Sequence, residues 1–349
     1  MMRSPDKVAI AVRRENGDIV VKCDANNPIS KKHKWMGLPF IRGVVNFCLM
    51  LSIGMKTLTT STQMLGIADE EPTKFEKWLS QKLGKGIDKI VMGTAIVLAV
   101  ILSVLLFFML PELVAKLLKS VISSNVLVNL LSGIVRILIL IGYIMFCAKV
   151  PDVRRTFQYH GAEHKTVYCH EHEKPLTPEN ARVYTTLHPR CGTSFLLIVF
   201  VLSIILFTIL GYQGDSYILR LLSRLALLPV VAGVSYELLQ YLAKHENAFI
   251  RAVRWPGMQL QRLTTKQPDD GMLEVAIASM KAAIDGLPEG KRTSEGWVIL
   301  PPSDEYLAAN PKAKAAREKS AAKSEKTENA EAADTTDSAA QPESAEGNG

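Results

Sequence analysis

Two histidines and a glutamate stand at a spacing that can bind a metal ion and activate water. Residues 160–164 read His160-Gly161-Ala162-Glu163-His164, a His-x-x-Glu-His pattern typical of inverted zinc hydrolases. Residues four apart on a helix share one face, so both imidazoles can bind one ion. Glu163 then lies near the metal-bound water, and we predict that it acts as the general base.

Further metal-binding residue types follow this motif. Five of the seven histidines lie between residues 160 and 188, and Cys191 comes soon after them. A catalytic zinc ion needs three protein ligands and one open position. His188 and Cys191 are the local candidates for the third ligand. Glu237 is an outside candidate, because an ionisable residue within an apolar run is a functional candidate.

The type of metal and its role follow from these ligands. A set of His and Cys ligands favours zinc-like ions. The alternative to a catalytic centre is a closed structural zinc site made by His160, His164, His188 and Cys191. Thr193 and Ser194 directly precede an apolar run and are expected to cap its helix. Their hydroxyls and the N–H groups of the helix start are also a candidate anion or oxyanion site.

Four apolar runs predict that a membrane domain positions these residues. About 20 apolar residues in a helix cross the hydrocarbon core, and backbone groups in lipid must be satisfied within a helix. A shorter run, Gly43–Met55, is too short to span the membrane. It is expected to form an interfacial or re-entrant helix, or a buried helix of the cytoplasmic part. The predicted spans are Ile90–Leu110, Val126–Ala148, Phe195–Tyr212 and Tyr217–Ala243.

The distribution of Lys and Arg predicts the orientation of the spans. Seven of these residues lie in the connection 149–194, against two in 111–125 and none in 213–216. Basic connections stay in the cytoplasm, and no signal peptide is expected at the start. We therefore predict a multi-pass protein of the inner (plasma) membrane with cytoplasmic N- and C-termini. The net charge of +7 suits anionic membrane lipids as partners rather than nucleic acid, and a cytoplasmic loop makes disulfides unlikely to form.

Four regions are predicted along the chain. Residues 1–88 form a cytoplasmic β-hairpin over 7–23, with an Asn16-Gly17 turn, and the interfacial helix. Residues 89–243 form the four-span domain with the cytoplasmic His-rich loop 149–194. A helix is expected over 151–168, in which Gly161 allows another group to approach closely. Residues 244–300 form a cytoplasmic, helical membrane-surface segment with a helix over 271–285. Residues 301–349 form a disordered tail.

Several segments resemble the YqhQ-like family, bacterial membrane proteins of unknown function that are predicted to be metal-dependent enzymes. The segments are 157–166 and 188–195, with further matches at 39–43, 235–237 and 256–265. The resemblance implies a membrane fold and a metal ion. Family members usually begin with a stretch containing Gly-Gly-Gln-Ala, whereas this chain begins Met1-Met2-Arg3. We therefore expect that the true start lies upstream and that part of the first strand is missing.

Three hypotheses for the function follow from these observations. The first is a zinc-dependent hydrolase or peptidase at the cytoplasmic membrane face, acting on a membrane protein or a lipid-linked ester. The second is a non-enzymatic factor in membrane-protein biogenesis or quality control, with a structural metal site. The third is a transporter in which Glu237 and Arg136 line the path.

Overall fold

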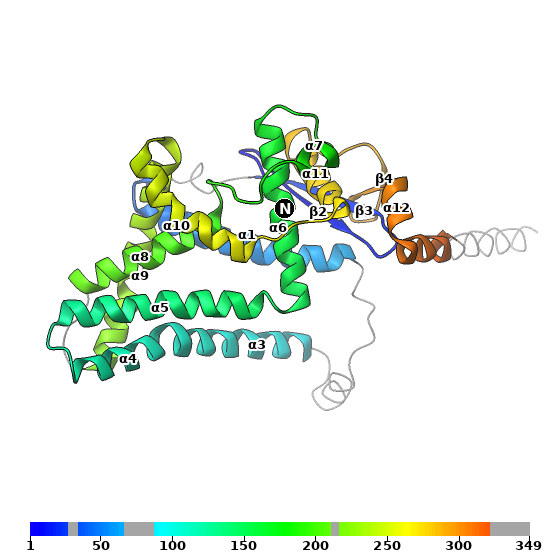
Figure 1. Cartoon of the computed structure of the whole chain (residues 1–349). Helices are drawn as coiled ribbons and strands as arrows, with labels where there is room; N and C mark the ends of the chain where they lie inside the picture. Colours follow the sequence, from blue (N-terminus) through cyan, green and yellow to red (C-terminus); the bar gives the residue numbers. More distant parts are fainter. Residues whose placement is uncertain (27–33, 66–86, 211–215, 322–349) are drawn as a thin grey trace, which may run out of the picture.

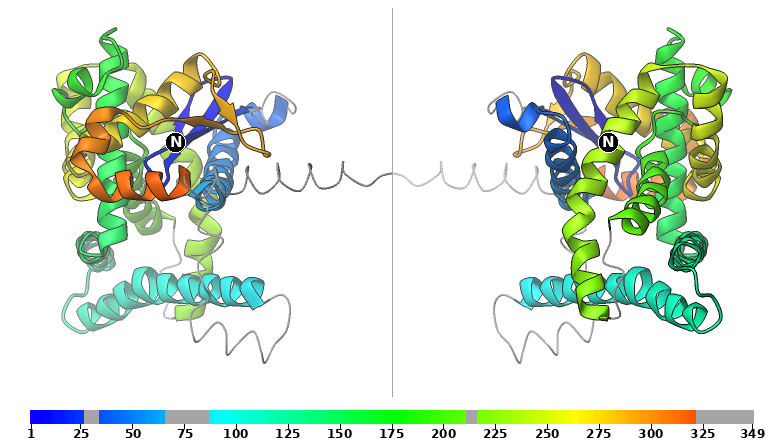
Figure 2. Two further views of the ribbon diagram at one scale, coloured as in Figure 1. Left: turned by 90° about the vertical axis from the view of Figure 1, so that its right-hand side faces the viewer. Right: turned by 90° about the vertical axis from the view of Figure 1, so that its left-hand side faces the viewer.

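The computed structural model describes residues 1–26, 34–65, 87–210 and 216–321. These residues are mostly helical and carry one small antiparallel sheet (Figure 1). The sheet and the helices packed on it lie on one side of the molecule, and the helices between residues 87 and 147 lie on the other. Figure 2 shows the same separation, with the sheet near the top and the helix of residues 87–119 across the bottom.

The sheet contains the predicted hairpin. Strands β2 (Lys7–Arg13) and β3 (Ile19–Ala25) pair in antiparallel register. Gly17 takes a positive φ of 86° in the turn between them, which glycine adopts without strain. The side chain of Asn16 accepts a hydrogen bond from the Asp18 N–H at 3.1 Å. The hairpin prediction is confirmed.

Three further strands enlarge this hairpin to a five-stranded sheet. The strand order is β1-β2-β3-β5-β4, with β1 at Met2–Arg3, β4 at Lys291–Arg292 and β5 at Val298–Leu300. β5, near the end of the described residues, pairs with β3, near the start of the chain. The segment 244–300, predicted to be helical, thus contains helices and then ends in two short strands. Strands of two and three residues are too short to give a period-two pattern.

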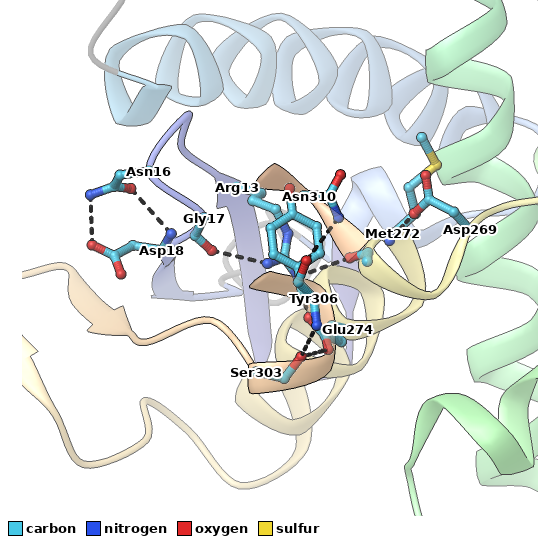
Figure 3. Close-up of polar contacts among 11 residues, drawn as sticks. Arg13, Asn16, Gly17, Asp18, Asp269, Met272, Glu274, Ser303, Tyr306 and Asn310 are labelled. Atoms are coloured by element: carbon cyan, nitrogen blue, oxygen red, sulfur yellow. Dashed lines mark hydrogen bonds and ion pairs between the residues drawn. The ribbon is translucent and has the colours of Figure 1, made fainter. Parts of the chain in front are cut away.

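The chain after residue 300 packs against the sheet instead of being disordered up to residue 321. Helix α12 (Asp304–Ala309) begins at Ser303, whose hydroxyl accepts from the Tyr306 N–H at 3.1 Å. The Arg13 guanidinium lies 3.7 Å over the Tyr306 ring and 2.5 Å from a carboxylate oxygen of Glu274 (Figure 3). Disorder was predicted here from the alanine-rich composition, and that average did not reveal the few residues that anchor the segment. The predicted disorder of residues 322–349 lies outside the described residues.

Helix α11 (Asp270–Ile284) forms where a helix was predicted, but it is not on the surface. The carboxylate of Asp269 accepts a hydrogen bond from the Met272 N–H at 2.8 Å and so caps the helix. Leu273, Ala276 and several neighbours are buried in a core shared with the sheet and α6. A helix covered on two sides is apolar over much of its circumference, so its composition resembles that of an interfacial helix.

Within the described residues, four helical stretches are long and apolar enough to cross a membrane, and they differ from the predicted set in one member. They are Ile41–Leu65, Gly93–Lys119, Val126–Cys147 and Ile218–Leu242. The second is built from α3 (Ile87–Val104), a π-helical turn (Leu105–Met109) and α4 (Leu110–Lys119), so most of the predicted loop 111–125 is helical. The third and fourth belong to α5 (Asn125–Cys147) and α9 (Tyr217–Lys244). Helix α8 (Gly192–Ile209) matches the remaining predicted span but has 18 residues, and its described apolar part, Leu196–Ile209, is shorter.

Helix α1 (Ile41–Leu65) has 25 residues, so the prediction that this region is too short to span is wrong in length. Beyond the strictly apolar residues, two of its hydroxyl groups are satisfied within the helix: Thr59 and Thr62 donate to backbone carbonyls four residues earlier, at 3.1 and 3.0 Å. The last turn buries Met64 against the sheet. Helix α1 therefore joins the apolar helices to the sheet.

The remaining helices connect the two sides of the molecule. Helix α6 (Pro151–Glu171) follows α5 and runs at a steep angle to it (Figures 1 and 2). Helix α7 (Pro178–Arg182) follows α6, and α10 (Ala248–Thr264) follows α9. Leu140 and Ile144 of α5 share a core with Leu260 of α10. This packing brings α6, α8 and α10 together, and the predicted site residues lie between them.

Candidate metal centre

Three predicted ligands meet where α6 approaches the start of α8. His160 and His164 lie on one face of α6, with ring centroids 4.4 Å apart. Cys191 is the N-cap residue of α8, and its Sγ lies 3.2 Å from His160 Nε2. One ligand atom from each of these residues lies within 4.8 Å of the others. We refer to His160, His164 and Cys191 as the three-ligand cluster.

Two backbone carbonyls orient the imidazoles toward this cluster. His160 Nδ1 lies 2.9 Å from the Thr264 carbonyl oxygen, and His164 Nδ1 lies 2.5 Å from the Thr186 carbonyl oxygen. A carbonyl only accepts, so each Nδ1 carries a proton, and in the neutral imidazole each Nε2 then has a free lone pair. Metal-binding histidines are commonly oriented in this way. The sequence offered no signal for Thr186 and Thr264, because every residue type has a carbonyl.

Gly161 permits one of these contacts, as the sequence predicts. A Cβ at position 161 would lie 2.1 Å from the Lys266 carbonyl oxygen and 3.2 Å from the Thr186 side chain. The Lys266 N–H donates to the Phe157 carbonyl at 2.9 Å, which holds the segment after α10 against α6. The segment that carries Thr264 is therefore seated directly on Gly161. The prediction that this glycine allows a close approach is confirmed.

Two buried side chains fix the segment between α7 and Cys191. The Lys165 ammonium donates to the backbone carbonyls of Arg182 and Tyr184, at 2.8 and 2.5 Å. The amide of Gln261 on α10 accepts from the His188 N–H and donates to the His188 carbonyl, both at 2.8 Å. Both ends of the segment are therefore held in place, and with them the Thr186 carbonyl and the Cys191 thiol.

The environment of Cys191 favours a thiolate. Burial raises the pKa of the Cys191 thiol, but hydrogen bonds from His160 and His164 outweigh that effect and lower the pKa to about 5. The Thr193 N–H, in the first turn of α8, also points to the sulfur at 3.4 Å. For His160, burial lowers the pKa, while Cys191, the Thr264 carbonyl and the charge of Glu163 together raise it. Without a metal, the geometry therefore supports a thiolate beside an imidazolium.

The cluster fits a zinc ion in donor chemistry and in size. Zn–N bonds of about 2.0–2.1 Å and Zn–S bonds of about 2.3 Å at tetrahedral angles place ligand atoms roughly 3.3–3.6 Å apart. The distance of 3.2 Å and the limit of 4.8 Å found here lie on either side of that range. A thiolate and two imidazoles with free Nε2 atoms are the protonation states that metal binding requires.

His188 lies next to the cluster but binds other groups. Its ring centroid is 5.7 Å from that of His164. Its Nε2 lies 3.4 Å from a carboxylate oxygen of Glu171, and its Nδ1 accepts from the Arg190 N–H at 3.3 Å. Both ring nitrogens are therefore engaged, and among the described residues the groups that could hold a metal include His160, His164 and Cys191 but not His188.

Glu237 is not brought to the cluster. Its carboxylate binds the Arg42 guanidinium through two contacts, at 2.7 and 2.5 Å, and accepts from the Phe40 N–H at 3.3 Å. This ion pair lies where α1 and α9 approach closely: a Cβ on Gly43 would collide with Gly233 and Tyr236 of α9, and a Cβ on Gly233 would collide with Phe40, directly before α1. Glu237 therefore ties α1 to α9.

The other predicted site residues have mixed positions. The Glu163 carboxylate lies 2.5 Å from the Met1 amino group, on the side of α6 that faces the sheet. Its role as general base stays a prediction. Thr193 belongs to the first turn of α8, and its hydroxyl is 3.2 Å from Cys191 Sγ. The Ser194 backbone belongs to the same turn, and the oxyanion role of both residues also stays a prediction.

Comparisons with known proteins place the chain in a family. A family model described as "Protein of unknown function (DUF1385)" matches residues 38–286. The chain belongs to this family. It is 34% identical to "Uncharacterized protein YqhQ" of Bacillus subtilis (strain 168) over 277 residues. The aligned region covers 77% of this chain and 84% of the relative. No solved structure matches the chain. The part that matches DUF1385 contains the whole three-ligand cluster, so the site lies within the family's own region.

Proposed function

We propose that this DUF1385 protein is a membrane-bound, metal-dependent hydrolase, with zinc held by His160, His164 and Cys191. The observation that carries the proposal is the geometry of the three-ligand cluster: both imidazoles present Nε2 toward a thiolate within 4.8 Å. Bound zinc would lower the pKa of a water molecule toward neutrality. The protein's residues orient the ligands, exclude bulk water by burial and supply a base.

The number of ligands favours catalysis over a structural metal site. Structural zinc sites have four protein ligands, whereas catalytic sites keep one position open. Within the described residues, the cluster contains three ligands, and the nearby His188 is already bound to Glu171 and to the Arg190 N–H. A non-enzymatic role in membrane-protein biogenesis or quality control, with a closed metal site, remains the alternative hypothesis.

The proposed general base is Glu163, which precedes His164 on α6. Its charge contributes to the raised pKa of His160 after the larger effects of burial, Cys191 and Thr264, so its carboxylate lies within electrostatic reach of the cluster. Acting as the base requires a rotamer in which the carboxylate leaves the Met1 amino group and turns to the metal side. This step is the part of the proposal that a substitution tests most directly.

The proposed location is the cytoplasmic face of the inner membrane, with both termini in the cytoplasm. Four apolar helices of sufficient length support a membrane location. The sheet, α11 and α12 gather on the side opposite α3 and α4 (Figure 1), and the basic connection 149–194 lies on the sheet side with α6. A transporter is less well supported, because Glu237 binds Arg42 and Arg136 donates to the Phe107 carbonyl at 3.0 Å.

The experiment is a measurement of bound metal and of hydrolysis on matched variants. The purified full-length protein is expected to bind one zinc ion, and a cobalt-substituted sample is expected to show a sulfur-to-metal charge-transfer band that Cys191→Ser removes. Glu163→Gln is expected to keep the metal and lose hydrolysis of a panel of lipid and peptide esters.

Two results would reject the proposal in different ways. A wild-type protein without stoichiometric metal would rule out every metal-dependent role. A Glu163→Gln variant with full hydrolysis would remove Glu163 as the base and leave the metal centre in place. His164→Ala, which removes a ligand, serves as the metal-free reference in both cases.

A further inference from the structure

A cavity of about 590 Å³ lies between α8, α9 and α10, and Arg190, the residue before Cys191, belongs to its lining. Its size falls in the range of ligand pockets, about 300–1,000 Å³. It lies along the middle turns of α8 and the last turns of α9. Its walls are mostly aliphatic and include Leu197, Val201, Ile205, Leu238, Leu242 and Val253.

Part of the cavity wall is exposed and apolar, as expected of a surface that faces lipid. Val201 and Ile205 line it and still expose 44% and 47% of their surface. Trp255, in the adjoining turn of α10, exposes 61%. Tryptophan is enriched at the membrane–water interface. An occupant of this cavity therefore enters from the membrane and ends at the interface.

Two guanidinium groups mark the polar end of the cavity. Arg254 of α10 donates to the His245 carbonyl at 3.1 Å, which uses one of its five N–H groups. Arg190 lines the same cavity, lies 2.8 Å from Glu171 and is directly followed by Cys191. Over residues 244–262 the chain carries four basic residues and one acidic residue. The polar end therefore complements an anion such as a phosphate.

We propose that this cavity binds an anionic phospholipid of the membrane, with acyl chains between α8, α9 and α10 and the phosphate at Arg254 and Arg190. Arginine binds phosphate through several parallel hydrogen bonds, which makes it well suited to this position. The headgroup end then lies one residue from Cys191 in the chain. The inference rests on the proposed function in one respect: it makes membrane lipid the substrate class of the hydrolase.

Native mass spectrometry of the full-length protein in detergent tests the binding. Dioleoylphosphatidylglycerol is expected to be retained in preference to dioleoylphosphatidylcholine. Arg254→Gln is expected to weaken phosphatidylglycerol binding about tenfold, the effect of losing one charge-assisted interaction, and to abolish the preference. Val201→Trp fills the cavity and is expected to remove both lipids.

Arg251→Gln is the matched control, because it removes the same charge from the same helix outside the cavity lining. If Arg251→Gln and Arg254→Gln lower lipid binding equally, the preference reflects net charge and the proposal is overturned. Unchanged lipid binding by Val201→Trp also overturns it, because the lipid would then sit elsewhere. Metal content is measured in each sample. Selective lipid binding by a wild-type protein without metal would leave the lipid site standing and reject the hydrolase.

Discussion

Replacing Gly161 by alanine is the sharpest perturbation of the proposed centre, because it adds one methyl group and changes no ligand. That methyl carbon would lie 2.1 Å from the Lys266 carbonyl oxygen, whereas ordinary contact begins at 3.4 Å. The segment after α10 must therefore retreat by about 1.3 Å, the difference between these distances. The Thr264 carbonyl lies two residues earlier and is 2.9 Å from His160 Nδ1.

The retreat is expected to break the contact that orients His160. If Thr264 follows Lys266 fully, its oxygen moves to about 4.2 Å from Nδ1, beyond hydrogen-bond range. Loss of such a supporting contact lowers metal affinity about 10–100-fold. Overpacking costs about 1–3 kcal/mol, but alanine regains about 1 kcal/mol of helix propensity. The net change in stability is therefore small, and metal affinity is the more informative measurement.

The assay is competition for zinc between the purified protein and a chromophoric chelator, together with thermal unfolding. Gly142→Ala is the control, because Gly142 lies in helix α5 and a Cβ there would meet nothing within 4 Å. It is expected to keep wild-type metal affinity and to be neutral or stabilising. The reasoning is refuted if Gly161→Ala also binds zinc with wild-type affinity and unfolds at a higher temperature.

Four further predictions follow from the same contacts. In the metal-free protein, alkylation of Cys191 followed by peptide mass spectrometry should stay fast as the pH falls and slow only near pH 5. The pKa of Cys191 is lower in the folded than in the unfolded protein, so the stability that this thiolate contributes should decrease as the pH falls toward 5. An alkylation rate that rises only near pH 9 would contradict both statements. Lys165→Met removes a charged donor from two part-buried carbonyls and should lower the free energy of unfolding in urea by about 1–3 kcal/mol in total. Tyr306→Leu removes the ring beneath Arg13 and should cost about 0.5–2 kcal/mol in thermal unfolding, whereas Tyr306→Phe keeps the ring and should cost less. His188→Ala should retain zinc, and a loss of metal in that variant would restore His188 as a ligand.

The sequence predicted the local structure well where a strong periodic or turn signal exists. The hairpin turn at Asn16-Gly17, the helix over the His-x-x-Glu-His motif and the helix predicted over 271–285 are all present. Apolar runs of about 20 residues predicted three of the helices that are long and apolar enough to cross a membrane. These features depend on neighbouring residues, so a single sequence contains the information for them.

The sequence predicted the ends of helices and the pairing of distant segments less well. Helix α1 extends past its apolar run, where its last turn packs Met64 against the sheet. The strand Val298–Leu300 and the helix Asp304–Ala309 depend on partners almost 300 residues earlier in the chain, namely β3 and Arg13. Short segments of this kind have no periodicity of their own, and their structure comes from the surface on which they pack.

The same division holds for the candidate site. The sequence by itself determined the chemistry: His160 and His164 on one helical face, with Cys191 at the start of a later helix as a possible third ligand. Only the tertiary structure chose between Cys191 and the alternatives, because His188 is held by Glu171 and Glu237 by Arg42. It also showed that the carbonyls of Thr186 and Thr264 orient the imidazoles. The sequence could not predict this, because every residue type has a backbone carbonyl. Ligand identity is a property of side chains, whereas ligand orientation depends on which backbone segments the fold brings beside them.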